Sequence, residues 1–344
     1  MRITFAPWGE SLDELMDVAR RAERAGAETL WVPELHRSAT VAAAAIATAT
    51  ERALVGTAIA LAFTRSPMIT ALEALDIDEL SGGRFLLGLG SGVQRLNEDW
   101  HNARFGKPVT HLRETVRDVR EFWRRCASGV PIDLAGDWEP MRIRGYQRPF
   151  TPLRTGIPIY IATMGPAMTR LAGAIADGWI SHELCSPMYM TERIVPQLEA
   201  GISTSPGKTR QDIDVVVSAC CSVADTEERA VARMSGLVGF YASVRTYADF
   251  FAFHGLAEQQ QRVIEAFRTG RSADQLGGLV TPQMVHALTF AGTAQQVAQR
   301  IFEYEGIADS IKISPPTHGL TAQETRGAQS ELITLIADIT GSAS

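Results

Sequence analysis

Short apolar runs alternate with helical patterns along most of the chain. Eight runs rich in aliphatic and β-branched residues predict strands at residues 2–6, 29–33, 53–61, 84–90, 158–165, 177–182, 214–223 and 309–314. Helical patterns separate most of these runs, as expected of a parallel sheet whose crossovers are helices. Eight such repeats in 344 residues predict an α/β fold, a (β/α)8 TIM barrel with insertions.

Start and stop signals place several of the helices. Ser11 followed by Glu14 has the pattern of a capping box, and Gly26 is typical of the residue after a helix. An alanine-rich helix is expected at 39–49, and Pro67 suits the first position of the next one. Further helices are expected at 112–126, 165–176 and 292–306.

The barrel pattern is interrupted twice. Residues 130–150 are typical of a small hairpin, and residues 227–290 are too long and too helical for an ordinary crossover. We therefore expect a single barrel domain over residues 1–344, with a hairpin at about 130–150 and a helical insertion at about 227–290.

Composition narrows the range of partners. The chain is 45% hydrophobic and 21% charged, with a net charge of −6 and no run of like charges, which argues against nucleic acid and acidic membranes as partners. A small molecule is the expected partner. The first residues have no signal-peptide pattern and no later run resembles a membrane span, so a cytoplasmic location is expected. The four cysteines lack metal-ligand spacing, and no metal is expected.

The stretch LSGGRFLLGLGSG, residues 80–92, ends in three glycines separated by single residues. This spacing serves either a tight turn or a main chain that approaches a phosphate or a flat ring closely. A Rossmann domain is not favoured, because the following VQRLNEDWHNARFGKP has no early apolar helix. In a barrel these glycines lie at the C-terminal end of a strand, where barrel enzymes have their active sites, which favours a ligand.

Other predicted strand ends carry candidate chemistry. GPAM, residues 165–168, opens a helix whose free N–H groups could bind a phosphate, although an ordinary strand-to-helix turn has the same pattern. Glu34 and His36 follow the second strand, and His182 with Glu183 follows the sixth, as candidates for acid–base work, metal ligation or a structural role. A metal hydrolase is not favoured, because the first strand lacks a His-x-His pair.

The order of several motifs resembles that of the bacterial-luciferase-like superfamily of flavin and deazaflavin oxidoreductases. The motifs are WVPE, GTAIALAFTRSP, LSGGRFLLGLGSG, RFGKPVTHLRETVRDVREFW, PIYIATMGPAMTRLAGAIADGW and GTAQQVAQRI, which together span most of the chain. The resemblance is strongest to the coenzyme F420-dependent branch. Two departures are Glu34-Leu35-His36 where that branch often has Asp-His, and Ala58 where many members have Gly.

The resemblance implies a cofactor site. Glu34 would lie near the ring, the 58–60 segment behind it with a cis peptide at Ala58–Ile59, and 163–166 at the phosphate. The implied cofactor-binding residues are Glu34, Ala58, Ile59, Ala60, Gly90, Ser91, Gly92, Thr163, Met164, Gly165 and Pro166. Glu34, His36 and His182 are the candidate catalytic residues, each a possible source of a proton.

The function that these expectations imply is hydride transfer between coenzyme F420 and an unidentified small organic substrate. Two alternatives remain open at this stage. One is an FMN-dependent luciferase-like monooxygenase, and the other is a flavin-binding protein without turnover. The superfamily commonly forms dimers, so a homodimer is expected.

Overall fold

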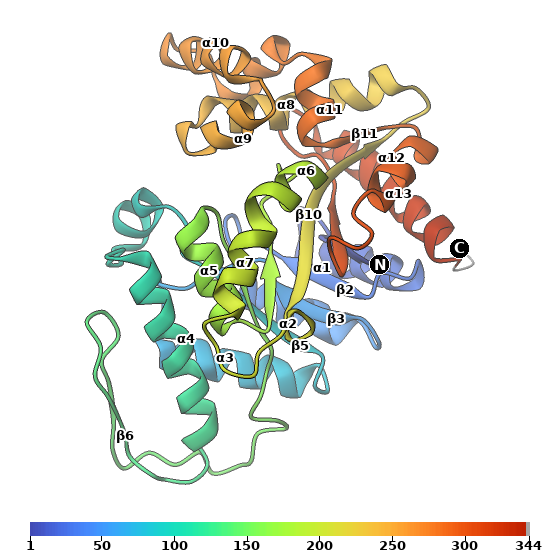
Figure 1. Ribbon diagram of the computed structural model, residues 1–344. Helices are drawn as coiled ribbons and strands as arrows, with labels where there is room; N and C mark the ends of the chain where they lie inside the picture. Colours follow the sequence, from blue (N-terminus) through green and yellow to red (C-terminus); the bar gives the residue numbers. More distant parts are fainter. Residues whose placement is uncertain (342–344) are drawn as a thin grey trace. The chain divides into compact units, whose positions relative to one another are not determined.

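The computed structural model describes residues 1–341, apart from the side chains of residues 273 and 274 (Figure 1). The chain divides into two compact units, each built from segments that are distant in sequence. Unit 1 consists of Met1–Glu28, Ser181–Val195 and the chain from Val216 onward, and unit 2 consists of Thr29–Ile180 and Pro196–Val215. The expectation of a single domain stays a prediction.

The strands form the sheet of a (β/α)8 barrel, which confirms the predicted fold class. Their bounds are β1 Arg2–Phe5, β2 Thr29–Val32, β3 Leu54–Thr57, β4 Ala60–Leu61, β5 Phe85–Gly90, β8 Ile159–Ala162, β9 Gly178–Ile180, β10 Asp214–Val223, β11 Phe290–Gly292 and β12 Ser310–Ser314. The strand order is β11-β10-β12-β1-β2-β3-β5-β8-β9, with β4 beside β5 and a further pairing of β9 with β10 that closes the sheet. Every predicted run contains a strand. Pairing is parallel between β1 and β12, β10 and β12, β2 and β3, β3 and β5, β5 and β8, and β8 and β9.

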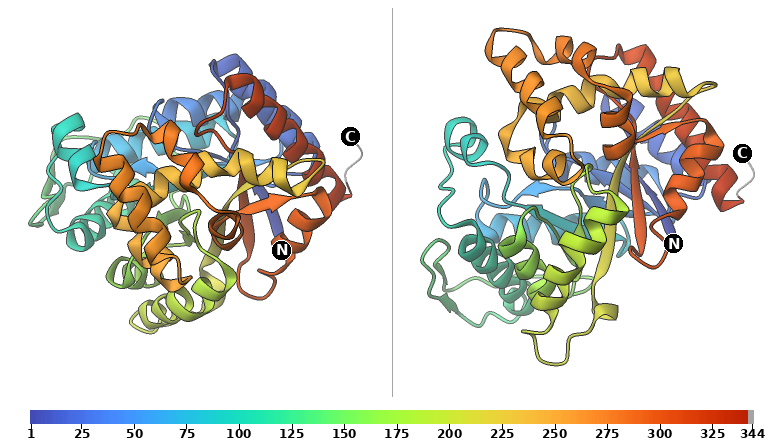
Figure 2. Two further views of the ribbon diagram at one scale, coloured as in Figure 1. Left: turned by 90° about the horizontal axis from the view of Figure 1, so that it is seen from above. Right: turned by 45° about the horizontal axis from the view of Figure 1, so that its top comes forward.

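Unit 1 contains the N-terminal helix and most of the C-terminal half. Its helices are α1 Leu12–Arg24, α6 Pro187–Tyr189, α8 Glu227–Ser243, α9 Ala248–Phe253, α10 Ala257–Arg268, α11 Pro282–Leu288, α12 Ala294–Phe302 and α13 Ala322–Thr340. Figure 2 shows α13 alongside α1, where Arg326 pairs with Glu14. The Ser11 hydroxyl caps α1 by accepting a hydrogen bond from the Glu14 N–H. The Glu14 carboxylate accepts from the Glu10 N–H rather than from the Ser11 N–H, so only half of the predicted capping box is formed.

Unit 2 contains the strands and helices from β2 to β9, together with α7 Val195–Ile202. Its other helices are α2 Ala39–Ala49, α3 Pro67–Leu80, α4 Pro108–Arg125 and α5 Pro166–Ile175. Helix α4 begins four residues before the predicted start at Leu112, because Pro108 provides a favourable first helical residue. The strands β6 Ile132–Leu134 and β7 Met141–Ile143 pair antiparallel within the predicted hairpin range.

The loop after β5 is more ordered than its polar sequence indicated. It contains one π-helical turn, Leu96–Trp100. The buried side chain of Asn97 donates to the carbonyl groups of Ser91 and Val93, at 2.8 and 3.0 Å, and so holds this turn against the glycine-rich end of β5. Within residues 1–341, none of the helices combines the length and apolar character that crossing a membrane requires.

Candidate functional site

Glu34, directly after β2, fixes the backbone of a neighbouring strand. Its Oε2 accepts hydrogen bonds from the Leu61 N–H at 2.8 Å and from Arg65 Nη1 at 2.9 Å, while Oε1 accepts from Arg65 Nη2. The Glu34 main chain takes part as well, because its N–H donates to the Ile59 carbonyl at 3.0 Å. Glu34 therefore holds residues 59–65 through both its main chain and its side chain.

These contacts also fix the charge of Glu34. Burial by itself raises the pKa of the carboxyl, but the Arg65 hydrogen bonds, the Leu61 N–H and the Arg65 charge outweigh burial and lower it. The carboxylate is thus ionised near neutral pH with both oxygens engaged. The role of proton source, one of those expected from the sequence, does not fit this arrangement, and an anchoring role does.

The segment just before β4 contains the cis peptide bond that the family resemblance implied. The Ala58–Ile59 peptide bond is cis, which confirms that prediction. The Ala58 N–H donates to the Val32 carbonyl at 2.8 Å, and Ala60 lies in register with Leu89 of β5. Ala58, Ile59 and Ala60 are therefore held between β2 and β5.

The glycines of β5 are explained first by this packing. A Cβ atom on Gly88 would lie 1.8 Å from the Thr57 carbonyl oxygen, and one on Gly90 would lie 2.9 Å from Ile59 Cγ1. Glycine is required at Gly88 because no side chain fits there. Ser91 and Gly92 form the turn that Asn97 holds, so the spacing that suggested a ligand serves strand packing as well.

Beside Glu34 lies a cavity of about 320 Å³. It is lined by Glu34, Leu35, His36, Arg37, Ser38, Leu61, Leu96 and His101. His36 is exposed at this cavity. The predicted catalytic residues Glu34 and His36 therefore share one cavity, and His101 joins them from the end of the π-helical turn, a contribution that the sequence pattern did not indicate.

The predicted anion site is the start of α5, and the space in front of it is open. Gly165 precedes the helix with φ 78° and ψ 152°, a region that in practice only glycine occupies, and no atom lies within 4 Å of where its Cβ would be. Among the described residues, no side chain caps this helix, whereas serines cap α2 and α3. The exposed first turn, with Met164 before it and Pro166 within it, leaves N–H groups for a ligand.

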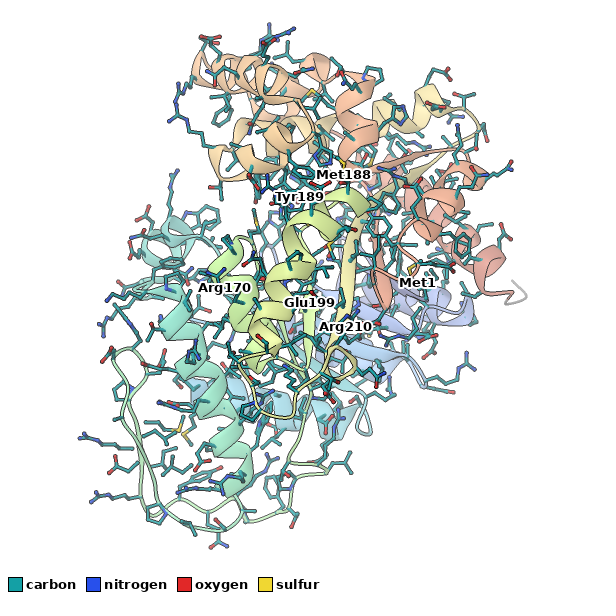
Figure 3. All side chains as sticks on the ribbon, viewed as in Figure 1. Met1, Arg170, Met188, Tyr189, Glu199 and Arg210 are labelled. Atoms are coloured by element: carbon teal, nitrogen blue, oxygen red, sulfur yellow. The ribbon has the colours of Figure 1, made fainter. Side chains whose placement is uncertain are left out.

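Two side chains near this turn have structural partners instead. The Thr163 hydroxyl accepts from Trp179 Nε1 at 2.7 Å and lies 3.3 Å from the Thr169 hydroxyl. Arg170, labelled in Figure 3, donates to Gln197 of α7. These bonds engage the Thr163 hydroxyl and one nitrogen of Arg170, and the main-chain N–H groups of the turn remain available to an anion.

His182 lies in unit 1, on the loop after β9, so it belongs to a different unit from the other predicted site residues. Burial lowers the pKa of its ring to about 4, and the nearby Lys312 charge adds to this effect. The ring is therefore neutral at pH 7. Its Nδ1 accepts from the Leu184 N–H at 3.3 Å, which places the hydrogen of the neutral ring on Nε2.

The neighbours of His182 form a polar group that the sequence only partly indicated. Glu183 accepts from the Tyr241 hydroxyl at 2.9 Å and from the Ser314 hydroxyl at 3.1 Å. Burial raises the pKa of Glu183, but the Lys312 charge, His182 and these hydroxyl groups together lower it. Lys312 lies on β12, all of whose residues are buried. The signal available in the sequence was a lysine within a predicted barrel strand, because the strands of a parallel barrel are covered on both faces.

Comparison with known proteins identifies relatives over nearly the whole chain. The family model described as luciferase-like monooxygenase matches residues 3–310. A Mycobacterium tuberculosis protein that carries the name coenzyme F420-dependent oxidoreductase is 29% identical over 320 residues, covering 86% of this chain and 89% of its own.

Two solved structures share the fold. The coenzyme F420-dependent tetrahydromethanopterin reductase from Methanopyrus kandleri is 22% identical with a TM-score of 0.82, covering all of both chains. The oxygenating constituent of the diketocamphane monooxygenase from Pseudomonas putida, in complex with FMN, is 16% identical with a TM-score of 0.67, covering 99% of this chain and 98% of its own.

Proposed function

Since the chain belongs to the luciferase-like monooxygenase family, we propose that it is an oxidoreductase that transfers hydride between coenzyme F420 and a small organic substrate. The observation that carries this proposal is the uncapped, open start of α5 in a chain whose relative bears the name of an F420-dependent oxidoreductase. The family and the fold are common to F420 and FMN proteins alike, so the choice of cofactor is part of the proposal.

The residues of unit 2 fit a flat ring with a phosphate-bearing tail. The open space at Gly165 and the free N–H groups of the α5 start suit the phosphate. Main chain at 58–60 and 90–92, held by Glu34 and Asn97, offers a fixed and largely apolar surface for the ring. The deazaflavin ring, when bound, supplies the hydride chemistry, and the protein supplies placement.

The chain restricts where a proton can be held. Glu34 is ionised with both oxygens engaged, and His182 is neutral with its Nδ1 occupied. Neither can release a proton at neutral pH as an ordinary acid. His36, exposed at the 320 Å³ cavity beside Glu34, remains the candidate for proton exchange with solvent.

An FMN-dependent monooxygenase is the second candidate, favoured by the description of the family and by the FMN-bound structure that shares the fold. The test is to measure the rate at which the protein oxidises reduced F420 and reduced FMN in the presence of candidate substrates, with oxygen and without it. The proposal predicts substrate-dependent oxidation of reduced F420 that continues when oxygen is removed. Oxidation of reduced FMN that requires oxygen, with no response to F420, would replace it with the monooxygenase.

A further inference from the structure

Buried and half-buried aromatic side chains of unit 1 pack around His182. The ring of His182 lies 4.6 Å from that of Tyr247, 4.8 Å from that of Tyr241 and 5.4 Å from that of Phe250, centroid to centroid. The tyrosines and Phe250 come from the predicted helical insertion, on α8, the turn Arg245–Tyr247 and α9. In Figure 3, Tyr189 marks the segment beneath α9, where its hydroxyl donates to Asp249 at 2.7 Å.

Among the side chains that the structure describes, three hydrogen-bond donors of this group have no acceptor in the protein. They are Nε2–H of His182, the hydroxyl of Tyr247 and the ammonium of Lys312. None of the three is a fully sealed polar atom, so each keeps some access to a ligand. Water can reach these donors in the free protein, and a bound ligand that displaces this water must accept hydrogen bonds from them in its place.

The Glu183 carboxylate does not meet this need. Glu183 already accepts from the Tyr241 and Ser314 hydroxyls, and its charge acts on Lys312 without a contact of ion-pair length. The charges of Glu183 and Lys312 cancel, so the group as a whole is neutral. A neutral acceptor fits it better than an anion, which would leave a net negative charge out of water.

We propose that His182, Tyr247 and Lys312 form a binding site for the carbonyl oxygen of a flat, apolar organic molecule. The oxygen would accept from these donors, and the rings of Tyr241 and Phe250 would contact the apolar part of the ligand. That this ligand is the hydride acceptor rests on the proposed function; the binding site itself does not.

The test is calorimetric titration of the protein, without any cofactor, with benzylideneacetone, a flat conjugated ketone, and with β-methylstyrene, which lacks the oxygen. The ketone should bind about tenfold or more tightly than the hydrocarbon, because only the ketone offers an acceptor. Equal affinities, or no binding of the ketone, would overturn the proposal. Tighter binding of cinnamate than of the ketone would also overturn it, since the site would then be selecting an anion.

Variants separate the site from general packing. His182→Phe and Tyr247→Phe keep a flat ring and remove a donor, and each should weaken ketone binding about tenfold. Tyr146→Phe makes the same chemical change in unit 2 and should leave binding unchanged. Unchanged binding in both unit 1 variants would refute the role of these donors.

The outcome is independent of the cofactor. A protein that binds F420 but not the ketone would remove this inference alone. A protein that binds the ketone but binds only FMN would remove the proposed function alone.

Discussion

At the residue scale, the Glu34 carboxylate joins two neighbouring strands through an ion pair with Arg65 and a bond from the Leu61 N–H. Replacing it with glutamine keeps the shape and removes the charge. Glu34→Gln should lower the free energy of unfolding at pH 7 by about 2 kcal/mol, because Arg65 then lacks its main partner. Exposed Glu199→Gln is the matched control and should stay within about 0.5 kcal/mol of the parent.

The sign of the pH dependence follows from the lowered pKa of Glu34. Its stabilising effect is fully present above the unfolded value of about 4.5 and is lost as pH falls through the lower folded value. Denaturant unfolding should therefore show the gap between Glu34→Gln and the parent shrinking below about pH 4.5. A gap that stays constant down to pH 3 would mean that the carboxylate charge is not what stabilises this contact.

His182 should make the protein less stable as the pH falls, whereas a histidine paired with a carboxylate would make it more stable. Its pKa is lowered from 6.5 to about 4, by burial first and by Lys312 second, while Glu183 opposes the shift; Tyr241 and Tyr247 also face the ring. The unfolded chain binds a proton below pH 6.5 that the folded chain excludes until about pH 4, so stability falls as pH drops through this window.

His182→Phe removes this proton and keeps a flat ring. The dependence of unfolding free energy on pH between 4 and 6.5 should be less steep in the variant than in the parent. Identical slopes would show that folding does not lower the pKa of the His182 ring.

Thr163 distinguishes a structural role from a cofactor role. Its hydroxyl accepts from Trp179 Nε1, so Thr163→Val should cost about 1–2 kcal/mol by leaving a buried donor unpaired. F420 affinity of the folded variant should not change. Loss of F420 binding with unchanged thermal stability would restore the direct contact that the family resemblance implied.

At the element scale, the start of α5 carries the phosphate hypothesis. Gly165→Asp would put a negative charge and a side chain into the open space before the helix, and should weaken F420 binding about tenfold or more. Gly207→Asp is the control, because Gly207 also has positive φ and open space in unit 2. Equal F420 affinity of the two variants would make the α5 start a purely structural turn.

Strands and helices with strong local signals could be predicted from the sequence. The run DVVVSACCSV became β10 with its predicted bounds, and the alanine-rich segment became α2. The short strand Phe290–Gly292 was not separated from its helical surroundings, since three residues show no period. Helix α13 was not assigned either, although Thr321 and Glu324 form a complete capping box there.

Site positions were more predictable than their chemical state. Glu34 and His182 follow strands, which is visible in the sequence, but the partners that fix their charges come from distant segments. Arg65 reaches Glu34 from beyond β4, and Lys312 acts on His182 from β12. Such pairs depend on tertiary packing, which a single sequence does not encode as a local pattern.

At the scale of the whole molecule, the chain divides into two units that carry different candidate sites. Unit 2 holds the predicted cofactor-binding residues and the Glu34 cavity, and unit 1 holds the His182 group. We propose the hydride carrier as the ligand of unit 2 and a carbonyl compound as the ligand of unit 1. The identity of the hydride carrier decides which reaction the protein carries out.

Equilibrium titration of the cofactor-free protein with F420 and with FMN, followed by fluorescence, identifies the carrier directly. We expect saturable F420 binding at about micromolar concentration or below, with negligible FMN binding, in a range ordinary for a specific small-molecule site. Tight FMN binding with no response to F420 would contradict it.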